Sequence, residues 1–392
     1  MKNVCLLGST GSIGLSTLDV IKLNPDEYSV VALTANKNLK RLLAQCVEFR
    51  PRYAVVSKHD DADTFRQMLE SSDAADTLVL SGAESLEFVA QLPEVSIVVA
   101  AIVGAAGLLA TLAAANASKT LLLANKESLV ISGDLLMTAV KDNGGLLLPV
   151  DSEHNALFQC MPDGYKAGQR IDGVRKLILT ASGGPFLNAM PGELENVTVE
   201  QACAHPNWSM GKKISVDSAT MMNKGLEVIE ASYLFDMPAE LIQVLVHPQS
   251  IIHSMVDYVD GSVLAQLGNP DMKTPIAHAL AWPKRHRSGV AALDFITNNQ
   301  LSFEAPSYDK FPCLRLAYEA LDIKGTAPAI LNAANEIAVD AFLSKRLRFM
   351  EIPKLIEKVM VNSTIDSADS IESVITADAE ARIIAKQYVE NF

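Results

Sequence analysis

The stretch Val4-Cys5-Leu6-Leu7-Gly8-Ser9-Thr10-Gly11-Ser12-Ile13-Gly14-Leu15 decides the fold of this chain. Val4 to Leu7 has the composition of a buried strand, and a helical pattern begins near Leu15. Glycines between a strand and a helix permit a tight turn and a close approach of the backbone to a pyrophosphate. A plain strand-to-helix turn would look similar, but the position after the first strand favours a dinucleotide site.

Apolar runs alternate with segments of helical length and period from Asn3 to Val150. This alternation predicts a parallel sheet covered by helices on both faces, and hence a Rossmann-like α/β domain over residues 1–150. The expected strands are Val4–Leu7, Tyr28–Leu33, Tyr53–Val56, Thr77–Leu80, Val95–Val99, Thr120–Leu123 and Leu146–Pro149.

The end of the second expected strand indicates which dinucleotide binds. It lacks the acidic residue that would hold an adenosine ribose 2'-hydroxyl. Lys and Arg attract a 2'-phosphate that Asp would repel, so we expect NADP(H) rather than NAD. The residues offered there are Asn36, Lys37, Asn38, Lys40 and Arg41.

Composition excludes several classes of protein. A length of 392 residues suggests two or three domains, and a net charge of -13 argues against a nucleic-acid or membrane-surface role. The five cysteines are scattered without a C-x-x-C pair, which indicates a reducing, cytoplasmic setting. Met1 to Leu7 runs straight into a strand pattern, so we expect no signal peptide. Ile97 to Ala115 is uncharged, but its glycines indicate a strand, a turn and a helix rather than a membrane span.

The segment from Ala204 to Ala231 holds the densest group of candidate functional residues. Its apolar positions Met222, Leu226, Ile229 and Tyr233 have helical spacing, so one face should pack on a core. A helix capped by Asp217 or Ser218 could direct backbone N–H groups and polar side chains at one anion. An ordinary solvated face is the alternative. The polar face comprises Thr220, Asn223, Lys224, Glu227 and Glu230.

Trp208 stands among Gly, Ser and Lys residues just before that helix. An apolar ring in such surroundings suits a lid over a ligand better than a core strand. We therefore predict a lid over His205 to Lys212.

Two further segments follow strands of the predicted sheet. Ala124 to Ser128 follows the sixth strand, where ligands of open α/β sheets bind, although a helix cap with surface charge is an equal alternative. After the seventh strand, Asp151 and Glu153 would point the same way in an extended chain, and Glu227 could join them around Mg2+ or Mn2+. The alternative is an Asp that caps the next helix.

A central α/β catalytic domain is expected over residues 151–281, a linker over 282–308 and a C-terminal helical bundle over 309–392. Strands are expected at Leu177–Thr180, Leu241–Val246 and Ser262–Leu267, and helices at Ala329–Phe342 and Ile352–Val361. The loop Ala181-Ser182-Gly183-Gly184-Pro185 could hold a phosphate or be a plain turn. His247 and His253 are expected to be sheet residues rather than ligands.

The combination of these motifs closely resembles the 1-deoxy-D-xylulose 5-phosphate reductoisomerase family over nearly the whole chain. The motifs are Gly8–Gly14, Ala124–Ser128, Pro149–Asn155, Ser182–Pro185 and His205–Glu230. The resemblance implies NADPH-dependent and metal-dependent conversion of 1-deoxy-D-xylulose 5-phosphate to 2-C-methyl-D-erythritol 4-phosphate, in isoprenoid biosynthesis. It also implies a homodimer, and the Leu241–Leu267 region is our prediction for its interface.

The resemblance assigns roles by motif. Asp151, Glu153 and Glu227 would be both catalytic and the ligands of Mg2+, Mn2+ or, as a further alternative, Co2+. Lys126 and His205 would also be catalytic. The substrate would contact Lys126, Ser152, Glu153, Ser182, His205, Trp208, Ser218, Asn223, Lys224 and Glu227. The cofactor would contact Thr10, Gly11, Ser12, Ile13, Asn36, Lys37, Asn38, Asn125, Glu127 and Gly211. Asn36 stands where the family pattern leads us to expect Gly.

Two other functions remain compatible with parts of the sequence. An NADPH-dependent semialdehyde dehydrogenase has a similar glycine loop, but it needs an activated cysteine, and neither Cys160 nor Cys203 has a supporting motif. A non-catalytic NADPH-sensing regulator would have no use for three carboxylates and a phosphate site.

Overall fold

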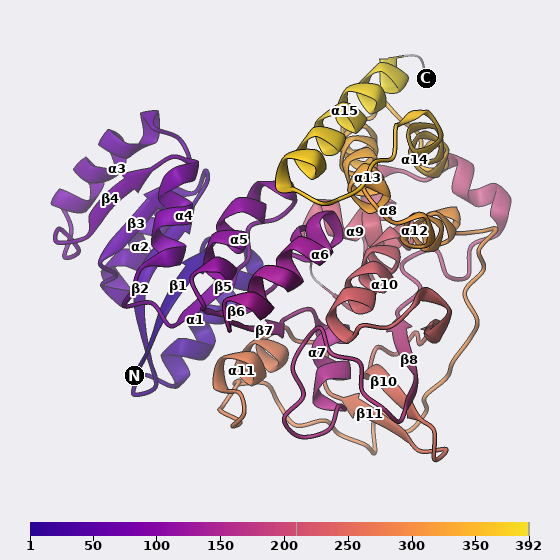
Figure 1. Ribbon diagram of the computed structural model, residues 1–392, viewed down its shortest axis with the longest axis horizontal. Helices are drawn as coiled ribbons and strands as arrows, with labels where there is room; N and C mark the ends of the chain where they lie inside the picture. The colour runs from indigo at the N-terminus through magenta and orange to yellow at the C-terminus, as the bar shows by residue number, and fades with distance from the viewer. Residues whose placement is uncertain (209, 391–392) are drawn as a thin grey trace. The chain divides into compact units, whose positions relative to one another are not determined.

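The computed structural model describes residues 1–208 and 210–390. The chain divides into two compact units (Figure 1). Unit 1 comprises Met1–Ser128, Leu136–Asn155 and Asp271–Ala291, and unit 2 comprises Leu129–Leu135, Ala156–Pro270 and Ala292–Phe392.

Unit 1 is built on a seven-stranded sheet in the order β4-β3-β2-β1-β5-β6-β7, with every neighbouring pair parallel. Its strands are β1 (Lys2–Leu7), β2 (Tyr28–Ala35), β3 (Tyr53–Val56), β4 (Leu78–Ser81), β5 (Ile97–Ala100), β6 (Thr120–Leu123) and β7 (Leu146–Pro149). All seven predicted strands are present; β3, β6 and β7 have the predicted ends, and the ends of the other four differ by at most two residues. Central strands such as β5 are buried throughout, as expected for a parallel sheet covered on both faces.

Helices connect these strands. They are α1 (Ser12–Leu23), α2 (Leu39–Phe49), α3 (Asp60–Glu70), α4 (Ala83–Gln91), η1 (Ala105–Gly107), α5 (Leu108–Asn116) and α6 (Lys126–Asp142), and α11 (Lys273–Ala281) joins from later in the chain. The uncharged Ile97–Ala115 segment forms β5, η1 and most of α5. Within the described part of the chain, no helix has the length and apolar character needed to cross a membrane.

Unit 2 contains a four-stranded sheet in the order β11-β10-β8-β9. Its strands are β8 (Val174–Ala181), β9 (Ile242–Val246), β10 (Ile252–Tyr258) and β11 (Val263–Leu267). Only β8 and β9 pair in parallel, while β10 runs antiparallel to β8 and to β11. The sequence analysis missed β10 because its apolar residues are interrupted by His253, Ser254 and Asp257, all of which are buried.

The helices of unit 2 fall into two groups. Between β8 and β9 in the chain come η2 (Pro191–Asn196), α8 (Val199–Ala202), α9 (Lys212–Ala219), α10 (Met222–Phe235) and η3 (Ala239–Leu241), and α7 (Ser152–Gln159) precedes β8. The C-terminal group is α12 (Pro312–Ile323), α13 (Ala327–Leu343), α14 (Glu351–Asn362) and α15 (Ile371–Glu390), with α13 packed against the other three (Figure 1). The two predicted C-terminal helices are α13 and α14, and the α/β class with a helical C-terminal region is confirmed.

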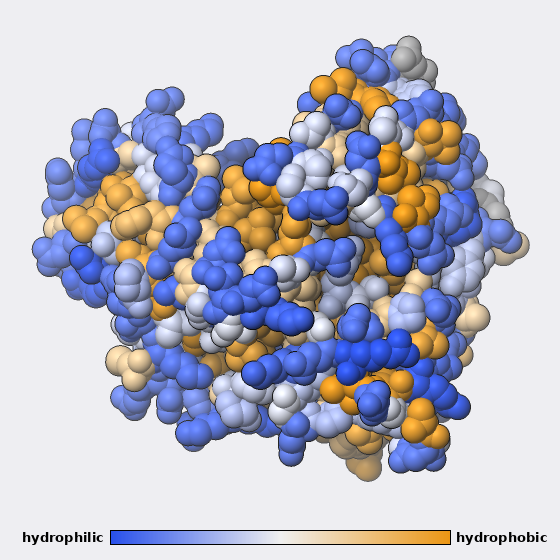
Figure 2. All heavy atoms as spheres, viewed as in Figure 1, coloured by the Kyte–Doolittle hydropathy of each residue, from blue (hydrophilic) through white to orange (hydrophobic). Residues whose placement is uncertain are grey.

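Hydrophilic side chains cover most of the face seen in Figure 2, with apolar patches between them. This distribution agrees with the content of 20% charged residues.

The expectation that Asp217 or Ser218 caps the helix that carries Met222 and Leu226 is wrong. Asp217 and Ser218 lie inside α9, and α10 begins separately at Met222. Met221 has a φ of 59°, and this left-handed residue separates α9 from α10. Helix α10 has no side-chain cap. The sequence hid this break because a Met in the left-handed region is uncommon.

Candidate active site

The glycine loop of unit 1 turns as the sequence predicts, but α1 begins at Ser12 rather than near Leu15. Gly8 has a φ of 85°, and a Cβ atom there would lie 2.7 Å from the Ala101 carbonyl oxygen. A Cβ on Gly14 would lie 2.4 Å from the Ser9 carbonyl oxygen. These close approaches exclude larger side chains at both positions, and the loop leaves the N-terminus of α1 exposed at Gly11 and Ser12.

A buried glutamine that the sequence analysis missed fixes this loop. Ser9 Oγ donates to Gln45 Oε1 at 2.7 Å, and Gln45 Nε2 donates to the Ser9 carbonyl at 2.8 Å. One polar residue on the amphipathic helix α2 gives no sequence signal of such a contact.

The residues predicted to select NADP(H) lie where β2 ends. Asn36, Lys37 and Asn38 are exposed, and a hollow of about 440 Å³ is lined by Lys37, Asn38, Leu39, Lys40 and Met68. Arg41 Nη1 donates to the carbonyl of Thr10 at 3.3 Å, so this basic group lies beside the glycine loop. The arrangement provides positive charge next to a nucleotide-binding turn.

Asn125 and Lys126 start helix α6. Asn125 caps it by accepting from the Ser128 N–H at 3.2 Å, as the capping alternative predicts, and its amide donates to the Gly104 carbonyl at 3.1 Å. The surface-charge part of that alternative is wrong, because Lys126 and Glu127 are both only 6% exposed. Lys126 Nζ lies 2.5 Å from Asp151 Oδ2.

Helix α7 begins at Ser152, directly after Asp151, so the chain is not extended there and the helix-capping alternative is the one observed. Asp151 accepts from the Glu153 N–H at 3.3 Å, as a capping residue does, and the two side chains still offer oxygens within 4.8 Å of each other. Ser152 Oγ donates to Glu153 Oε2 at 2.5 Å. A helix cap therefore places two carboxylates together as an extended strand would.

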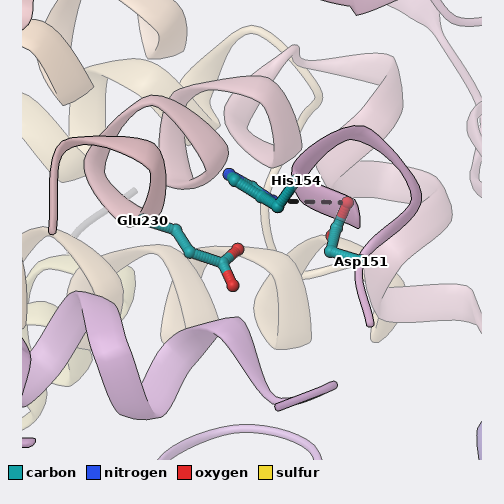
Figure 3. A group of neighbouring side chains, drawn as sticks. All are labelled: Asp151, His154 and Glu230. Atoms are coloured by element: carbon teal, nitrogen blue, oxygen red, sulfur yellow. Dashed lines mark ion pairs between the residues drawn. The ribbon is translucent and has the colours of Figure 1, made fainter. Parts of the chain in front are cut away.

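The surroundings of Asp151 keep it ionised. Burial disfavours its charged form, but the Lys126 ammonium and His154 outweigh this and hold the pKa of Asp151 well below its ordinary value. Figure 3 shows the ion pair with His154, whose Nδ1 lies 3.6 Å from Asp151 Oδ1, and also the Glu230 carboxylate that α10 carries. The role of His154 was missed because a single His in a helical pattern has no distinctive spacing.

In unit 2, the loop after β8 meets the predicted lid. His205 Nδ1 accepts from the N–H groups of Asn207 and Trp208 at 3.2 and 3.0 Å, so its Nε2–H donates to Ser182 Oγ at 2.8 Å in the neutral ring. Gly184, with a φ of 66°, packs so closely that a Cβ would lie 2.8 Å from the Ser218 carbonyl. Ser182, His205 and Ser218 therefore belong to one corner of the unit.

The polar residues of α10 are not solvated, so the alternative of an ordinary surface face is wrong. Lys224, Glu227 and Glu230 are 4%, 1% and 0% exposed. Lys224 pairs with Glu227 Oε2, and Asn223 Nδ2 donates to Glu227 Oε1 at 2.6 Å. Burying a lysine and two acids on one helix costs free energy that an apolar core would not, so these residues of α10 are candidates for a functional site.

The described part of the lid segment is attached to the loop after β9. Asn207 Nδ2 donates to the Pro248 carbonyl at 2.7 Å and to Ser250 Oγ at 2.9 Å, and the Trp208 ring lies 6.2 Å from that of His253. Gly211 is exposed and precedes α9. His247 lies outside the strands and accepts from Ile251 and Ile252 N–H groups at 3.2 Å, whereas His253 lies on β10.

The cysteines do not support a thiol mechanism. All five are free, and burial raises the pKa of Cys160 to about 11 and also raises the pKa of Cys203. Because the thiolate is the reactive form, both side chains are poor nucleophiles.

A glycine loop on a seven-stranded parallel sheet, in a chain whose second unit also buries a lysine and two glutamates, defines the class: a dinucleotide-dependent oxidoreductase. Comparison with known proteins then gives the family. Profiles described as 1-deoxy-D-xylulose 5-phosphate reductoisomerase, its C-terminal domain and the DXP reductoisomerase C-terminal domain match residues 4–133, 147–235 and 267–384. The chain belongs to the 1-deoxy-D-xylulose 5-phosphate reductoisomerase family.

Whole-length relatives agree with this assignment. A reductoisomerase of Methylococcus capsulatus is 61% identical over 391 residues, covering 100% of this chain and 99% of that protein. A DOX-P reductoisomerase crystallised with NADPH, fosmidomycin and magnesium matches with a TM-score of 0.95 and 47% identity, covering 100% of this chain and 98% of that chain. The Zymomonas mobilis enzyme with NADPH matches with a TM-score of 0.91 and 49% identity, covering 99% and 98%. The family confirms the prediction of an NADP-dependent oxidoreductase and favours neither alternative function.

Proposed function

We propose that this chain catalyses the NADPH-dependent and divalent-metal-dependent rearrangement and reduction of 1-deoxy-D-xylulose 5-phosphate to 2-C-methyl-D-erythritol 4-phosphate. The observation that carries the proposal is its match, over its whole length, to a reductoisomerase bound to NADPH, fosmidomycin and magnesium. The buried acids and lysines described above provide the chemistry that such a reaction needs.

A divalent cation would be held by Asp151, Glu153 and Glu227. Each of these side chains offers a carboxylate oxygen, the ligand type preferred by Mg2+ and Mn2+. The donor set fits, because Lys126 and His154 keep Asp151 ionised and the buried Glu227 is paired with the Lys224 ammonium. When bound, the cation acts as a Lewis acid on the carbonyl and hydroxyl oxygens of the substrate.

The chain's own side chains bind and orient the sugar phosphate. Ser182, Ser218, Asn223 and Lys224 would bind the phosphate, with His205 beside them. The free energy of phosphate binding would hold the reacting carbons in place and favour closure of the lid. With the lid closed, Trp208 would exclude water from the site. Lys126 and Ser152 would contact the carbon backbone of the substrate, each hydrogen-bonded to a predicted metal ligand.

NADPH would bind at the glycine loop of unit 1, through Thr10, Gly11, Ser12 and Ile13. Its 2'-phosphate would lie at the basic end of β2, with Asn36, Lys37 and Asn38. Asn125, Glu127 and Gly211 would complete the contacts. When bound there, NADPH would be the source of hydride for the reduction.

A homodimer is also proposed, with the Leu241–Leu267 region as its interface. Supporting this, β11 is an edge strand, and Val263 and Leu264 on it are 49% and 50% exposed. Edge strands with apolar side chains commonly pair with another chain. The division at residues 150, 281 and 308 into cofactor, catalytic, linker and helical parts, and a cytoplasmic location, remain our proposals.

The test is direct. Purified protein with Mg2+ or Mn2+ should oxidise NADPH only when 1-deoxy-D-xylulose 5-phosphate is added, and chelation should stop turnover while thiol blocking should not. If no NADPH is oxidised under these conditions, the proposal fails and a sensor role gains weight.

A further inference from the structure

A buried acid on α9 is bound by a side chain from the C-terminal helices. Asp217 is 1% exposed, and its Oδ1 accepts from Asn335 Nδ2 at 2.8 Å. Its Oδ2 pairs with Lys213 Nζ at 2.9 Å within the same helix. The bond from Asn335 thus connects Asp217 to helix α13, 118 residues further along the chain.

Burying the polar side chains of Asn335 and Asp217 costs free energy of folding. Asn335 is 0% exposed in the middle of α13, where an apolar side chain would suffice for packing. Its Oδ1 has no hydrogen-bond partner among the described residues, so burial of this oxygen costs free energy. The same amide group donates to Asp217 through Nδ2. A buried carboxylate likewise requires donors, and Asn335 supplies one of them.

Asp217 stands next to the corner that carries the proposed phosphate site. Thr220 Oγ1 donates to main-chain carbonyls of α9 and accepts from the Met222 N–H at 3.3 Å, which fixes the turn into α10. Ser218 lies before this turn, while Asn223 and Lys224 follow it. A displacement of the end of α9 would therefore move Ser218 and the first turn of α10 together.

We infer that Asn335 is a positioning residue: by holding Asp217, it sets the place of Ser218 and of the start of α10 for binding the substrate phosphate. The C-terminal helices thereby contribute to substrate affinity without touching the substrate. This inference rests on the proposed phosphate site.

Helix α13 provides a matched control. Asn332 is also 0% exposed, but its Nδ2 donates at 3.2 Å to Glu336 of the same helix. Asn332→Leu and Asn335→Leu make the same chemical change on one buried helix, and only the second removes a donor from Asp217.

The experiment compares both variants with the unchanged chain. Asn335→Leu should raise KM for the sugar phosphate about 10-fold, because Asp217 loses a buried hydrogen bond, while kcat and the Kd of NADPH change less than about 3-fold. Asn332→Leu should leave all three within about 3-fold. Amide hydrogen exchange in α9 should rise in Asn335→Leu alone.

A second variant keeps the test decisive. Asn335→Ser, which is smaller and too short to reach Asp217, should reproduce the KM effect if the Leu variant does not fold. Unlike a change at Asp217 itself, both variants leave the ion pair of Asp217 with Lys213 in place. Equal effects of the two Leu variants, or an unchanged KM in a folded Asn335→Ser, overturn the inference.

Failure of the proposed phosphate site would look different. In that case Lys224→Ala also leaves KM unchanged, and the inference falls with the site on which it rests. If Lys224→Ala raises KM and Asn335→Leu behaves like its control, the phosphate site stands and only the positioning role is wrong.

Discussion

Replacing Lys224 with Ala tests the phosphate site most directly. The side chain is 4% exposed and pairs with Glu227, which is 1% exposed. A charge-assisted hydrogen bond to a phosphate contributes about 1.5–3 kcal/mol, so KM for the sugar phosphate should rise about 10- to 100-fold. Initial rates of NADPH oxidation over a range of substrate concentrations would measure this, and kcat should fall less than KM rises.

The same change also affects the folded protein. Removing one partner of a buried ion pair costs about 3–5 kcal/mol, although Asn223 still donates to Glu227 at 2.6 Å and lowers that cost. Thermal unfolding of Lys224→Ala should therefore be reported beside its kinetics. Lys176→Ala is the control, because Lys176 lies on β8 and hydrogen-bonds Gln243. A folded Lys224→Ala with an unchanged KM would refute the phosphate role.

Three further predictions follow from the described contacts. Glu227→Gln should abolish turnover and weaken Mn2+ binding in calorimetry while NADPH binding persists; an active variant would contradict the metal assignment. Gly14→Ala should weaken NADPH binding measured by fluorescence, because the new Cβ would lie 2.4 Å from the Ser9 carbonyl; unchanged affinity would mean that the loop can adjust. Burial lowers the pKa of His278 from 6.5 to about 4. Between these two pH values His278 binds a proton in the unfolded protein but not in the folded one. The free energy of unfolding should therefore fall by at most about 3 kcal/mol as the pH drops from 6.5 to 4. Denaturant unfolding of His278→Gln should show a flatter pH profile, and an equally steep one would exclude this cause.

Short-range patterns predicted the parallel sheet well. Each strand from β1 to β7 is an apolar run bounded by turn residues, and such a signal depends only on neighbouring residues. Strand β10 was missed because buried polar residues interrupt its pattern, and their burial depends on the strands paired with it. The break at Met221 was missed because the sequence contained no glycine or proline to mark it.

In the candidate site, too, local features could be predicted and long-range contacts could not. Residue types and spacing singled out Asp151, Glu153 and Lys224, since loops after strands and helix faces are local features. Which partner each side chain has is a property of distant parts of the chain. Lys126 meets Asp151 because β6 and β7 are neighbours in a parallel sheet, so that their carboxyl ends share one edge. That pairing could have been foreseen from the order of the strands.

The Asn335 contact shows where such foresight stops. Topology places the carboxyl ends of adjacent parallel strands together, but no comparable rule fixes which residue of one helix faces another. The packing of α13 against α9 is set by side-chain shape along both helices, and a buried asparagine in an Ala-rich helix resembles many that bond only within their own helix. Asn332 is such a residue in the same helix. The two asparagines differ only in the residue to which each amide donates, Glu336 for Asn332 and Asp217 for Asn335. The role that we infer for Asn335 therefore depends on the tertiary fold and could not be read from the residues next to it in the sequence.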